Sequence, residues 1–236
     1  MKYLGGKSKL AGRIVDAISR EVGAARVWEP FCGGGAITTQ LARTRDYVAS
    51  TDVHRPLISM WRALQSGWVP PERLTLEQYT RARSLPDNDP LKAFAGFACS
   101  FGGKWFAGLA RGGQRADGTA RDHTNEASRN VRASIPYLGN VHFGRIDFFA
   151  VEPRGRMVLY CDPPYADTEG YKDTALFPHA DFWERCRAWH RAGSRVFVSE
   201  FACPVKHRTL CVFDRTVAVT QDKSKRVADS LYEVVG

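Results

Sequence analysis

The run Asp162-Pro163-Pro164-Tyr165 combines residue types that could perform chemistry on an amino group. It follows Met157–Cys161, a continuous apolar run that predicts a buried strand. Consecutive prolines remove two N–H donors and stiffen the turn, so the Asp162 carboxylate and the Pro163 carbonyl can be aimed at one point. Because both groups accept hydrogen bonds, their natural guest is a planar NH₂ group, and Tyr165 can lie against the ring that bears it. An ordinary proline turn would explain only the prolines, so Asp162, Pro163 and Tyr165 are the candidate catalytic residues.

A glycine-rich loop, Phe31-Cys32-Gly33-Gly34-Gly35, follows a second predicted strand at residues 26–30. Glycines let the backbone approach a ligand closely, and the helix predicted to follow offers free N–H groups at its start. Asp52 ends the next predicted strand, at residues 47–51, where an acid can accept hydrogen bonds from both hydroxyls of a ribose. The two features favour a ligand that contains a ribose, although a plain glycine turn and a helix-capping Asp would use the same residues.

The glycine spacing argues against two common ligand classes. The dinucleotide pattern GxGxxG fails because Thr38 stands where its third glycine belongs. Gly5-Gly6-Lys7-Ser8 looks like the end of a phosphate-binding loop, but no strand precedes it and the upstream glycine is missing. Nicotinamide cofactors and nucleoside triphosphates are therefore both disfavoured.

The segments around these loops alternate between helix and strand. Residues 1–67 predict the order α-β-α-β-α, with Ser8 as the N-cap of the first helix and Pro56 at the start of the third. Residues 141–236 return to this alternation, with a helix expected at 181–191 and strands at 141–147, 157–161, 195–199, 211–219 and 230–235. The alternation is typical of an α/β fold with a parallel sheet, in which ligands bind beyond the carboxyl ends of the strands.

Residues 68–140 differ in character and predict an inserted subdomain of helices and loops. Thr75 to Gln78 fits a capping box, Asp89-Pro90 fits a helix start, and residues 126–134 fit another helix. Between residues 102 and 121 the chain is rich in glycine and in basic side chains, and it is too polar to form a core. Any one of these basic side chains could be an ordinary solvated residue. Together the basic residues of the insert are the candidate DNA contacts: Lys104, Arg111, Arg115, Arg121, Arg129 and Arg132.

Composition limits the class of protein. The chain has 34 Lys and Arg against 25 Asp and Glu, a formal net charge of +9, which favours a polyanionic partner, either nucleic acid or a membrane surface. No stretch approaches about eighteen apolar residues and no apolar run follows Met1, so neither a membrane span nor a signal peptide is expected. The six cysteines show no CxxC pairing, which favours free thiols in a reducing cytoplasm over disulfides or a metal site.

Four elements occur along the chain in one order: Tyr3-Leu4-Gly5-Gly6-Lys7, Glu29–Gly35, Asp52 and Asp162–Tyr165. In that order they resemble the D12-class, Dam-like DNA adenine-N6 methyltransferases. The resemblance implies a Rossmann-like α/β sandwich that binds S-adenosylmethionine, with a mostly parallel sheet and an antiparallel C-terminal hairpin. Residues 1–67 and 141–236 would form the catalytic domain, and residues 68–140 the inserted target recognition subdomain.

By the same resemblance, the matched residues would contact S-adenosylmethionine. Tyr3 and Lys7 would contact its methionine end, and Asp52 its ribose hydroxyls. The other implied contacts come from Phe31, Gly33, Gly35, Asp162 and the pair Asp147-Phe148, which resembles the family's adenine-contacting pair. A solvated lysine at residue 7, and a helix-start Asp followed by a core Phe at residues 147–148, are the alternative interpretations.

The implied function is methyl transfer to N6 of adenine in double-stranded DNA, by direct transfer after the base has been flipped out of the helix. Cytosine N4, adenine N6 in RNA and a glutamine side chain offer the same NH₂ group, and a non-catalytic nucleic-acid-binding module on this fold is a further alternative. The chain departs from the family at His54, Ala107 and Glu200, where Asn is common. These differences leave the recognition sequence open.

Overall fold

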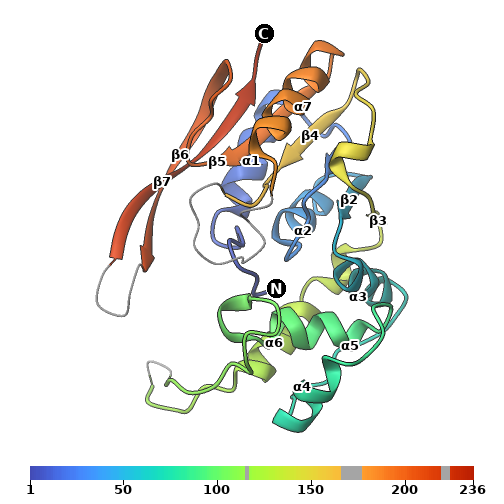
Figure 1. The fold of residues 1–236 in the computed structure, drawn as a ribbon, viewed down its shortest axis with the longest axis vertical. Coiled ribbons are helices and arrows are strands. Elements are labelled where there is room, and N and C mark those ends of the chain that lie inside the picture. The colour runs from blue at the N-terminus through green and yellow to red at the C-terminus, as the bar shows by residue number, and fades with distance from the viewer. Residues whose placement is uncertain (115–116, 166–176, 219–223) are drawn as a thin grey trace.

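The computed structural model describes residues 1–114, 117–165, 177–218 and 224–236 (Figure 1). Within these residues a seven-stranded sheet has the order β3-β2-β1-β4-β5-β7-β6. Strands β1 to β5 pair in parallel, and β7 pairs antiparallel with both β5 and β6. The strands are β1 (Val27–Glu29), β2 (Val48–Asp52), β3 (Val141–Arg145), β4 (Val158–Cys161), β5 (Arg195–Glu200), β6 (His207–Ala218) and β7 (Ser224–Val234). The predicted α/β class, with a mostly parallel sheet and an antiparallel C-terminal hairpin, is confirmed.

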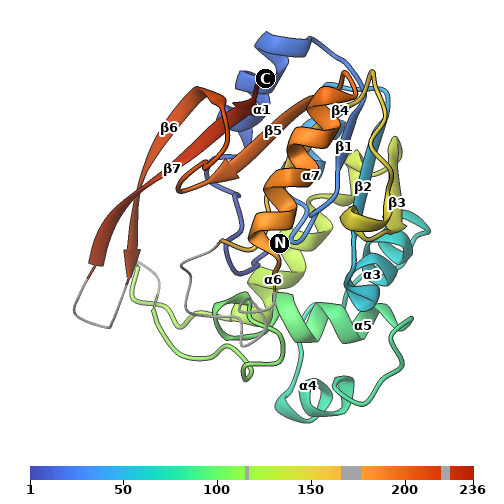
Figure 2. The same cartoon turned by 45° about the horizontal axis from the view of Figure 1, so that its top comes forward.

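Helices cover both faces of this sheet (Figures 1 and 2). Side chains alternate in direction along a strand, so Tyr160 and Phe197 pack with α1, α2 and α3 on one face. Leu159 and Val196 point to the other face and pack with α7. The helices are α1 (Ala11–Val22), α2 (Ala36–Ala42), α3 (Arg55–Gln65), α4 (Leu76–Ala82), α5 (Pro90–Ala93), α6 (His123–Arg132) and α7 (His179–Arg191), with short helical turns at Phe94–Ala98, Phe101–Gly103, Ile135–Tyr137 and Phe148–Ala150.

The centre of the sheet explains why the functional loops meet. Strand β4 is an apolar run, and β5 is buried from Val196 to Glu200, as expected of parallel strands covered on both faces. Strand β1 lies between β2 and β4 and runs parallel to both. The loops that follow these three strands therefore start at the same edge of the sheet.

Local signals predicted several helix starts correctly. Thr75 and Gln78 form the expected capping box at the start of α4. Asp89 caps α5, and Pro56 lies in the first turn of α3, as expected. None of the helices in the described ranges has the length and apolar character needed to cross a membrane.

The first helix starts later than expected. The prediction that Ser8 is its N-cap is wrong, because α1 begins at Ala11 and its N-cap is Leu10. A turn precedes the helix, in which the N–H groups of Leu10 and Ala11 both donate to the Lys7 carbonyl at 2.8 Å. This turn anchors the backbone of Lys7 and leaves Ser8 exposed.

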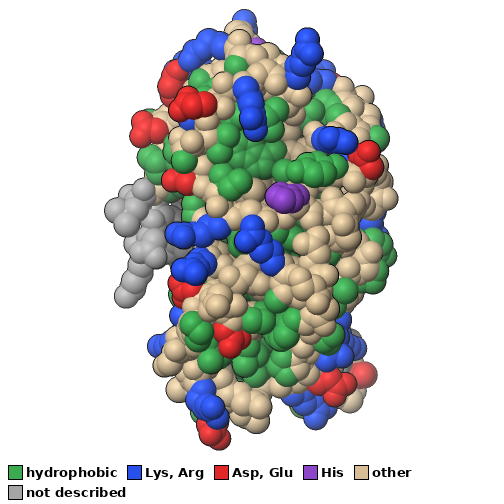
Figure 3. All heavy atoms as spheres, turned by 90° about the vertical axis from the view of Figure 1, so that its right-hand side faces the viewer, with side chains coloured by type: hydrophobic (Ala, Val, Ile, Leu, Met, Phe, Trp, Pro, Cys, Tyr) green, Lys and Arg blue, Asp and Glu red, His purple; other side chains and the backbone are tan. Residues whose placement is uncertain are grey.

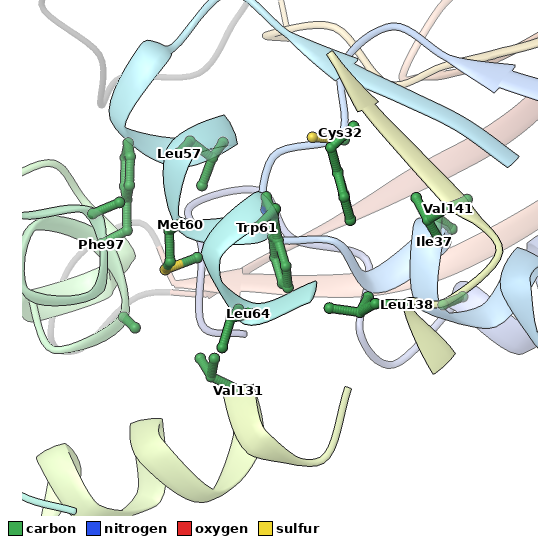
Figure 4. Packing of buried hydrophobic residues seen from close by; sticks show 14 of the residues in the cluster. Cys32, Ile37, Leu57, Met60, Trp61, Leu64, Phe97, Val131, Leu138 and Val141 are labelled. Atoms are coloured by element: carbon green, nitrogen blue, oxygen red, sulfur yellow. The ribbon is translucent and has the colours of Figure 1, made fainter. Parts of the chain in front are cut away.

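Residues 68–140 share their core with the rest of the protein. Phe97 and Val131 come from this insert and belong to the same hydrophobic cluster as Leu57, Met60 and Leu64 of α3 (Figure 4). The insert therefore packs directly on α3, and α4, α5 and α6 gather at one end of the molecule (Figure 1). Its assignment as a target recognition subdomain remains a prediction.

Candidate active site

The loops after β1, β2 and β4 contribute the predicted site residues at one edge of the sheet. Gly33, in the loop after β1, donates its N–H to Asp52 Oδ2 at the end of β2 (3.0 Å). Asp162 directly follows β4 and accepts a hydrogen bond from Lys7 Nζ at 2.8 Å. Burial raises the pKa of Glu29, at the end of β1, and the charges of Asp162 and Asp52 raise it further. The structure thus brings together residues that are far apart in the sequence.

Lys7 is buried at the centre of this region, with 3% of its surface exposed. Its ammonium nitrogen lies 2.8 Å from Asp162 Oδ1 and 3.6 Å from Asp229 Oδ2. The same nitrogen lies 4.3 Å from the centroid of the Tyr165 ring, a cation–π distance. The structure therefore differs from the alternative interpretation of a solvated lysine, and it places Lys7 beside both Asp162 and Tyr165.

Tyr165 is held at both its ring and its hydroxyl group. The hydroxyl donates a hydrogen bond to Asp229 Oδ1 at 2.8 Å, and the ring packs edge-on with Phe201 at a centroid distance of 4.6 Å. Burial raises the pKa of the Tyr165 hydroxyl well above its usual range. The hydroxyl therefore stays protonated and acts as a donor to Asp229 at ordinary pH.

Asp52 fixes the glycine loop as well as ending β2. Its Oδ2 accepts the Gly33 N–H and its Oδ1 accepts the His54 N–H, each at 3.0 Å. On the other side of the loop, Trp61 Nε1 donates to the Gly33 carbonyl at 3.2 Å. Burial raises the pKa of Asp52, and these backbone N–H groups act in the opposite direction. Acceptance of hydrogen bonds from ribose hydroxyls by Asp52 remains a prediction.

The three glycines of the loop allow two aromatic side chains to pack against it. A Cβ at Gly34 would lie 2.7 Å from Tyr3 Cβ, and a Cβ at Gly33 would lie 2.9 Å from Tyr3 Cε1. Gly35 has φ of 68° and would place a Cβ 2.6 Å from the Trp61 ring. Tyr3 is therefore in contact with the loop that the sequence assigned to the same ligand.

Phe31, Asp147 and Phe148 lie near one another beside α7. The Phe31 and Phe148 rings are 5.4 Å apart, and both pack against Phe182 of that helix. Phe148 is 1% exposed, and Asp147 Oδ1 accepts the Phe149 N–H at 2.9 Å as the N-cap of a short helical turn. This placement fits the alternative interpretation of a capping Asp and a core Phe, and contact of the pair with an adenine ring remains a prediction.

Three buried acids at this edge were not predicted as site residues: Glu29, Glu200 and Asp229. Glu29 accepts hydrogen bonds from Thr38 Oγ1 at 2.5 Å and Ser50 Oγ at 3.1 Å, and burial raises its pKa to about 8. Burial also raises the pKa of Glu200 to about 7. The signal available in the sequence was an acid within or at the end of an otherwise buried strand, which is rare without a partner or a function.

These raised pKa values predict a pH-dependent stability. A carboxyl group with a raised pKa binds its proton more tightly in the folded state, so for Glu29 stability falls as pH rises between about 4.5 and about 8. Between its unfolded and folded pKa values, each such group changes the free energy of unfolding by up to about 1.4 kcal/mol per pH unit. Urea unfolding of Glu29→Gln between pH 5 and pH 8.5 should show a shallower decline than the parent protein. The exposed control Glu77→Gln should keep the parent slope; parallel curves for Glu29→Gln would contradict the assignment.

The insert borders the site through a cluster of aromatic rings. The His54 ring, just after β2, packs against Trp105 and Phe97 of the insert at 4.5 and 4.9 Å, and Tyr3 packs against Phe97 at 4.9 Å. Burial lowers the pKa of His54 to about 4, so its ring is uncharged at neutral pH. A Cβ at Gly103 would lie 2.8 Å from the Tyr3 backbone, which shows how closely the insert approaches.

The predicted DNA contacts have different environments. Arg111 and Arg129 are exposed, and Lys104 is half-buried. Arg132 is half-buried and donates to the Pro70 carbonyl at 2.7 Å. Arg115 lies outside the described residues. Figure 3 shows Lys and Arg side chains on one face in separate groups, with hydrophobic areas between them.

Arg121 lines a cavity of about 400 Å³ between the N-terminal segment and α6. Its guanidinium pairs with Glu126 through two contacts, at 3.2 and 2.6 Å. Lys2 and Ser8 line this cavity from the N-terminal segment, and His123 lines it from α6, together with apolar residues such as Ala98 and Ala127. In the described ranges of the chain, no group of three or more His, Cys, Asp or Glu side chains is arranged to hold a metal ion.

Comparison with known proteins found a family model that matches the first part of the chain. The family model described as D12 class N6 adenine-specific DNA methyltransferase matches residues 3–89. No curated protein matches the sequence. The match supports an enzyme that transfers methyl groups, and the family implies S-adenosylmethionine as the donor.

Solved structures match most of the chain at low identity. They include the 23S rRNA methyltransferase ErmE (13% identical, 98% of this chain and 69% of that chain covered, TM-score 0.42). The tRNA (m1A58) methyltransferase TrmI from Aquifex aeolicus is 9% identical, with 100% and 72% covered and a TM-score of 0.40. Precorrin-6y C5,15-methyltransferase from Geobacter metallireducens is 6% identical, with 96% and 88% covered and a TM-score of 0.40.

The family match includes three of the four ordered sequence elements, namely Tyr3 to Lys7, the glycine loop and Asp52. Residues 3–89 of the chain are therefore similar to the D12 class N6 adenine-specific DNA methyltransferases.

Proposed function

We propose that this protein transfers the methyl group of S-adenosylmethionine to the N6 amino group of adenine in double-stranded DNA. The observation that carries the proposal is the meeting of Asp162 with buried Lys7 and Tyr165, at the edge where Asp52 and the glycine loop also lie. Asp162 and Pro163 offer two acceptors, and adenine N6 offers two donors. The D12 family match and the net charge of +9 support DNA as the substrate.

The residues at this edge suit S-adenosylmethionine. Bound there, it would supply an electrophilic methyl group on a positively charged sulfur. Two carboxyl groups, Asp162 and Asp229, face the single ammonium of Lys7, and this excess of acidic groups is compatible with a cation. Asp52 would hold the ribose hydroxyls. The remaining contacts would come from Tyr3, Lys7, Phe31, Gly33, Gly35, Asp162 and the pair Asp147 and Phe148.

Asp52→Ala should weaken S-adenosylmethionine binding roughly tenfold or more. The change removes the ribose acceptors and also the carboxylate that holds the Gly33 N–H, and a hydrogen bond to a charged group is worth about 1.5–3 kcal/mol. Isothermal calorimetry with S-adenosylmethionine measures the effect. Asp46→Ala, an exposed acid just before the same strand, is the matched control, and equal affinities for the two variants would refute the role of Asp52.

Asp162 and Pro163 would promote the reaction by orienting the amino group of the substrate. The N6 lone pair of adenine is delocalised into the ring, so the free amine is a poor nucleophile. Hydrogen bonds from N6 to the Asp162 carboxylate and the Pro163 carbonyl would favour a pyramidal nitrogen whose lone pair points at the methyl donor. Alignment of this kind can supply roughly 7–11 kcal/mol. No covalent intermediate with the enzyme is required, and Cys161, the cysteine nearest in sequence, is buried in β4.

Access to the base would require its extrusion from the duplex, which costs a few kcal/mol. Tyr165 would receive the extruded base on its ring, and base stacking is worth about 1–3 kcal/mol. The basic residues of the insert would then contact phosphates. Arg111 is the leading candidate, because it ends residues 105–111, a segment that resembles the family. Binding through phosphates weakens steeply with added salt.

The test is methylation of unmethylated genomic DNA with labelled S-adenosylmethionine, followed by nucleoside analysis and single-molecule sequencing. Label in N6-methyladenine at defined sites would support the proposal. Label in N4-methylcytosine, or label only in RNA or protein offered in parallel, would refute it in favour of another planar amine. Cofactor-independent nucleic-acid binding without any transfer would instead support a binding module.

A further inference from the structure

Asp229 is a buried acid in the last strand, and its position follows from the direction of that strand. Strand β7 runs antiparallel to β5, with Ser230 opposite Glu200. The first half of β7 therefore passes the edge where β5 ends, and Asp229 comes to lie beside the candidate site. Its side chain is 1% exposed.

Both carboxylate oxygens of Asp229 contact residues of the candidate site. Oδ1 accepts the Tyr165 hydroxyl hydrogen bond at 2.8 Å, and Oδ2 lies 3.6 Å from Lys7 Nζ. A buried acid is costly unless it is paired and hydrogen-bonded. These two contacts meet that requirement, and they tie Asp229 to the ring and to the cation that flank Asp162.

Lys7 is shared between two acids. Its ammonium group has three N–H donors. The shorter contact, 2.8 Å, goes to Asp162, and the longer, 3.6 Å, goes to Asp229. The same nitrogen also donates to the Gly5 carbonyl at 3.5 Å. If Asp229 lost its charge, Asp162 would be the one charged carboxylate paired with Lys7 among the described residues, and the ammonium group would compete more strongly with any amine that uses the same carboxylate.

We infer, resting on the proposed function, that Asp229 is a positioning residue for methyl transfer. It sets the plane of the Tyr165 ring through the tyrosine hydroxyl, and it draws Lys7 partly away from Asp162, so that Asp162 can accept an N–H of the target base. Asp229 acts on the substrate through Tyr165 and Lys7, and it has no direct contact with the amine in this scheme.

The test compares three variants by single-turnover methylation. Asp229→Asn keeps the shape and the acceptor for Tyr165 but removes the charge that faces Lys7, and Tyr165→Phe keeps the ring but removes the hydroxyl. Asp214→Asn is the matched control, because Asp214 is exposed on the neighbouring strand of the same hairpin. The transfer rate of Asp229→Asn should fall at least tenfold, and the affinities for S-adenosylmethionine and DNA should stay within twofold. Asp214→Asn should match the parent protein.

A double-mutant cycle with Asp229→Ala and Tyr165→Phe tests the route of the effect. If Asp229 acts partly through the tyrosine hydroxyl, Tyr165→Phe alone should lower the transfer rate at least fivefold. In the Asp229→Ala background the same change should lower the rate less than twofold. A transfer rate of Asp229→Asn within twofold of the parent would overturn the inference. A rate loss matched by equal losses of cofactor affinity and thermal stability would also overturn it, because Asp229 would then be structural only.

The proposed function and this inference can fail separately. An active parent protein with an unaffected Asp229→Asn variant refutes the positioning role alone. If the parent protein methylates a different amine, adenine in DNA is refuted as the substrate. The same comparison of rates on that amine then decides the role of Asp229. A parent protein that transfers no methyl group to any acceptor refutes both.

Discussion

Asp162→Ala is expected to lower the rate of methyl transfer roughly a thousandfold or more and to leave the fold intact. The substitution removes the carboxylate that holds the target amine in alignment, and alignment and fixed acceptors together account for effects of this size. The fold should survive because Lys7 Nζ keeps a carboxylate within 3.6 Å, that of Asp229, so its buried charge stays paired. Single-turnover methylation of DNA measures the rate, and thermal unfolding measures the stability.

Asp162→Asn is the matched control for this prediction. It keeps the size of the side chain and one acceptor oxygen that can face Lys7, but it replaces the second oxygen by a donor, which cannot accept an N–H of the target amine. We expect an intermediate loss of rate with little change in S-adenosylmethionine affinity. A near-parental rate for Asp162→Ala would remove the role assigned to this residue.

Gly35→Ala is expected to cost about 2–5 kcal/mol of unfolding free energy and to abolish cofactor binding. Gly35 has φ of 68°, where an alanine costs about 1–2 kcal/mol. The added Cβ would also lie 2.6 Å from the ring of Trp61, which is completely buried, and overpacking of this kind costs about 1–3 kcal/mol. Because Trp61 also donates to the Gly33 carbonyl, any movement of its ring displaces the loop.

The control Gly112→Ala separates backbone strain from steric overlap. Gly112 has φ of 75°, and a Cβ at this position would meet no atom within 4 Å. The Gly112→Ala variant should lose only the unfolding free energy that comes from placing an alanine at positive φ, about 1–2 kcal/mol, and it should keep its affinity for S-adenosylmethionine. Urea unfolding and calorimetry on both variants give the two quantities, and equal losses at the two positions would show that Trp61 does not restrain the loop.

The sequence was sufficient to predict the class of fold and most of the loops that form the site. Apolar runs such as Met157–Cys161 show where a strand is buried, and the residues just beyond them show what lies at its carboxyl end. Since parallel strands end at the same edge, the order of the elements was enough to place Asp52, the glycine loop and Asp162 together. The ordered motifs also indicated the family that the match over residues 3–89 supports.

Local patterns were less informative where packing decides the outcome. Ser8 has the chemistry of an N-cap, but a turn that anchors Lys7 delays the helix to Ala11. The glycines at 33 and 34 were interpreted as room for a ligand, and in the structure they also give room for Tyr3. The predicted insert showed a change of composition, yet its Phe97 and Val131 complete the core formed by α3.

The sequence alone determined which side chains lie at strand ends, because strand periodicity and turn chemistry act over a few residues. Only the tertiary structure decided which of them touch. The contact of Lys7 with Asp162 joins residues 155 positions apart, and that of Tyr165 with Asp229 joins residues 64 positions apart. Such contacts depend on the strand order and on the reversed direction of β7, which arise from packing of the whole sheet and leave no periodic trace in the chain. For this reason the partners of Asp229 are visible only in the folded protein, where the last strand lies beside β5.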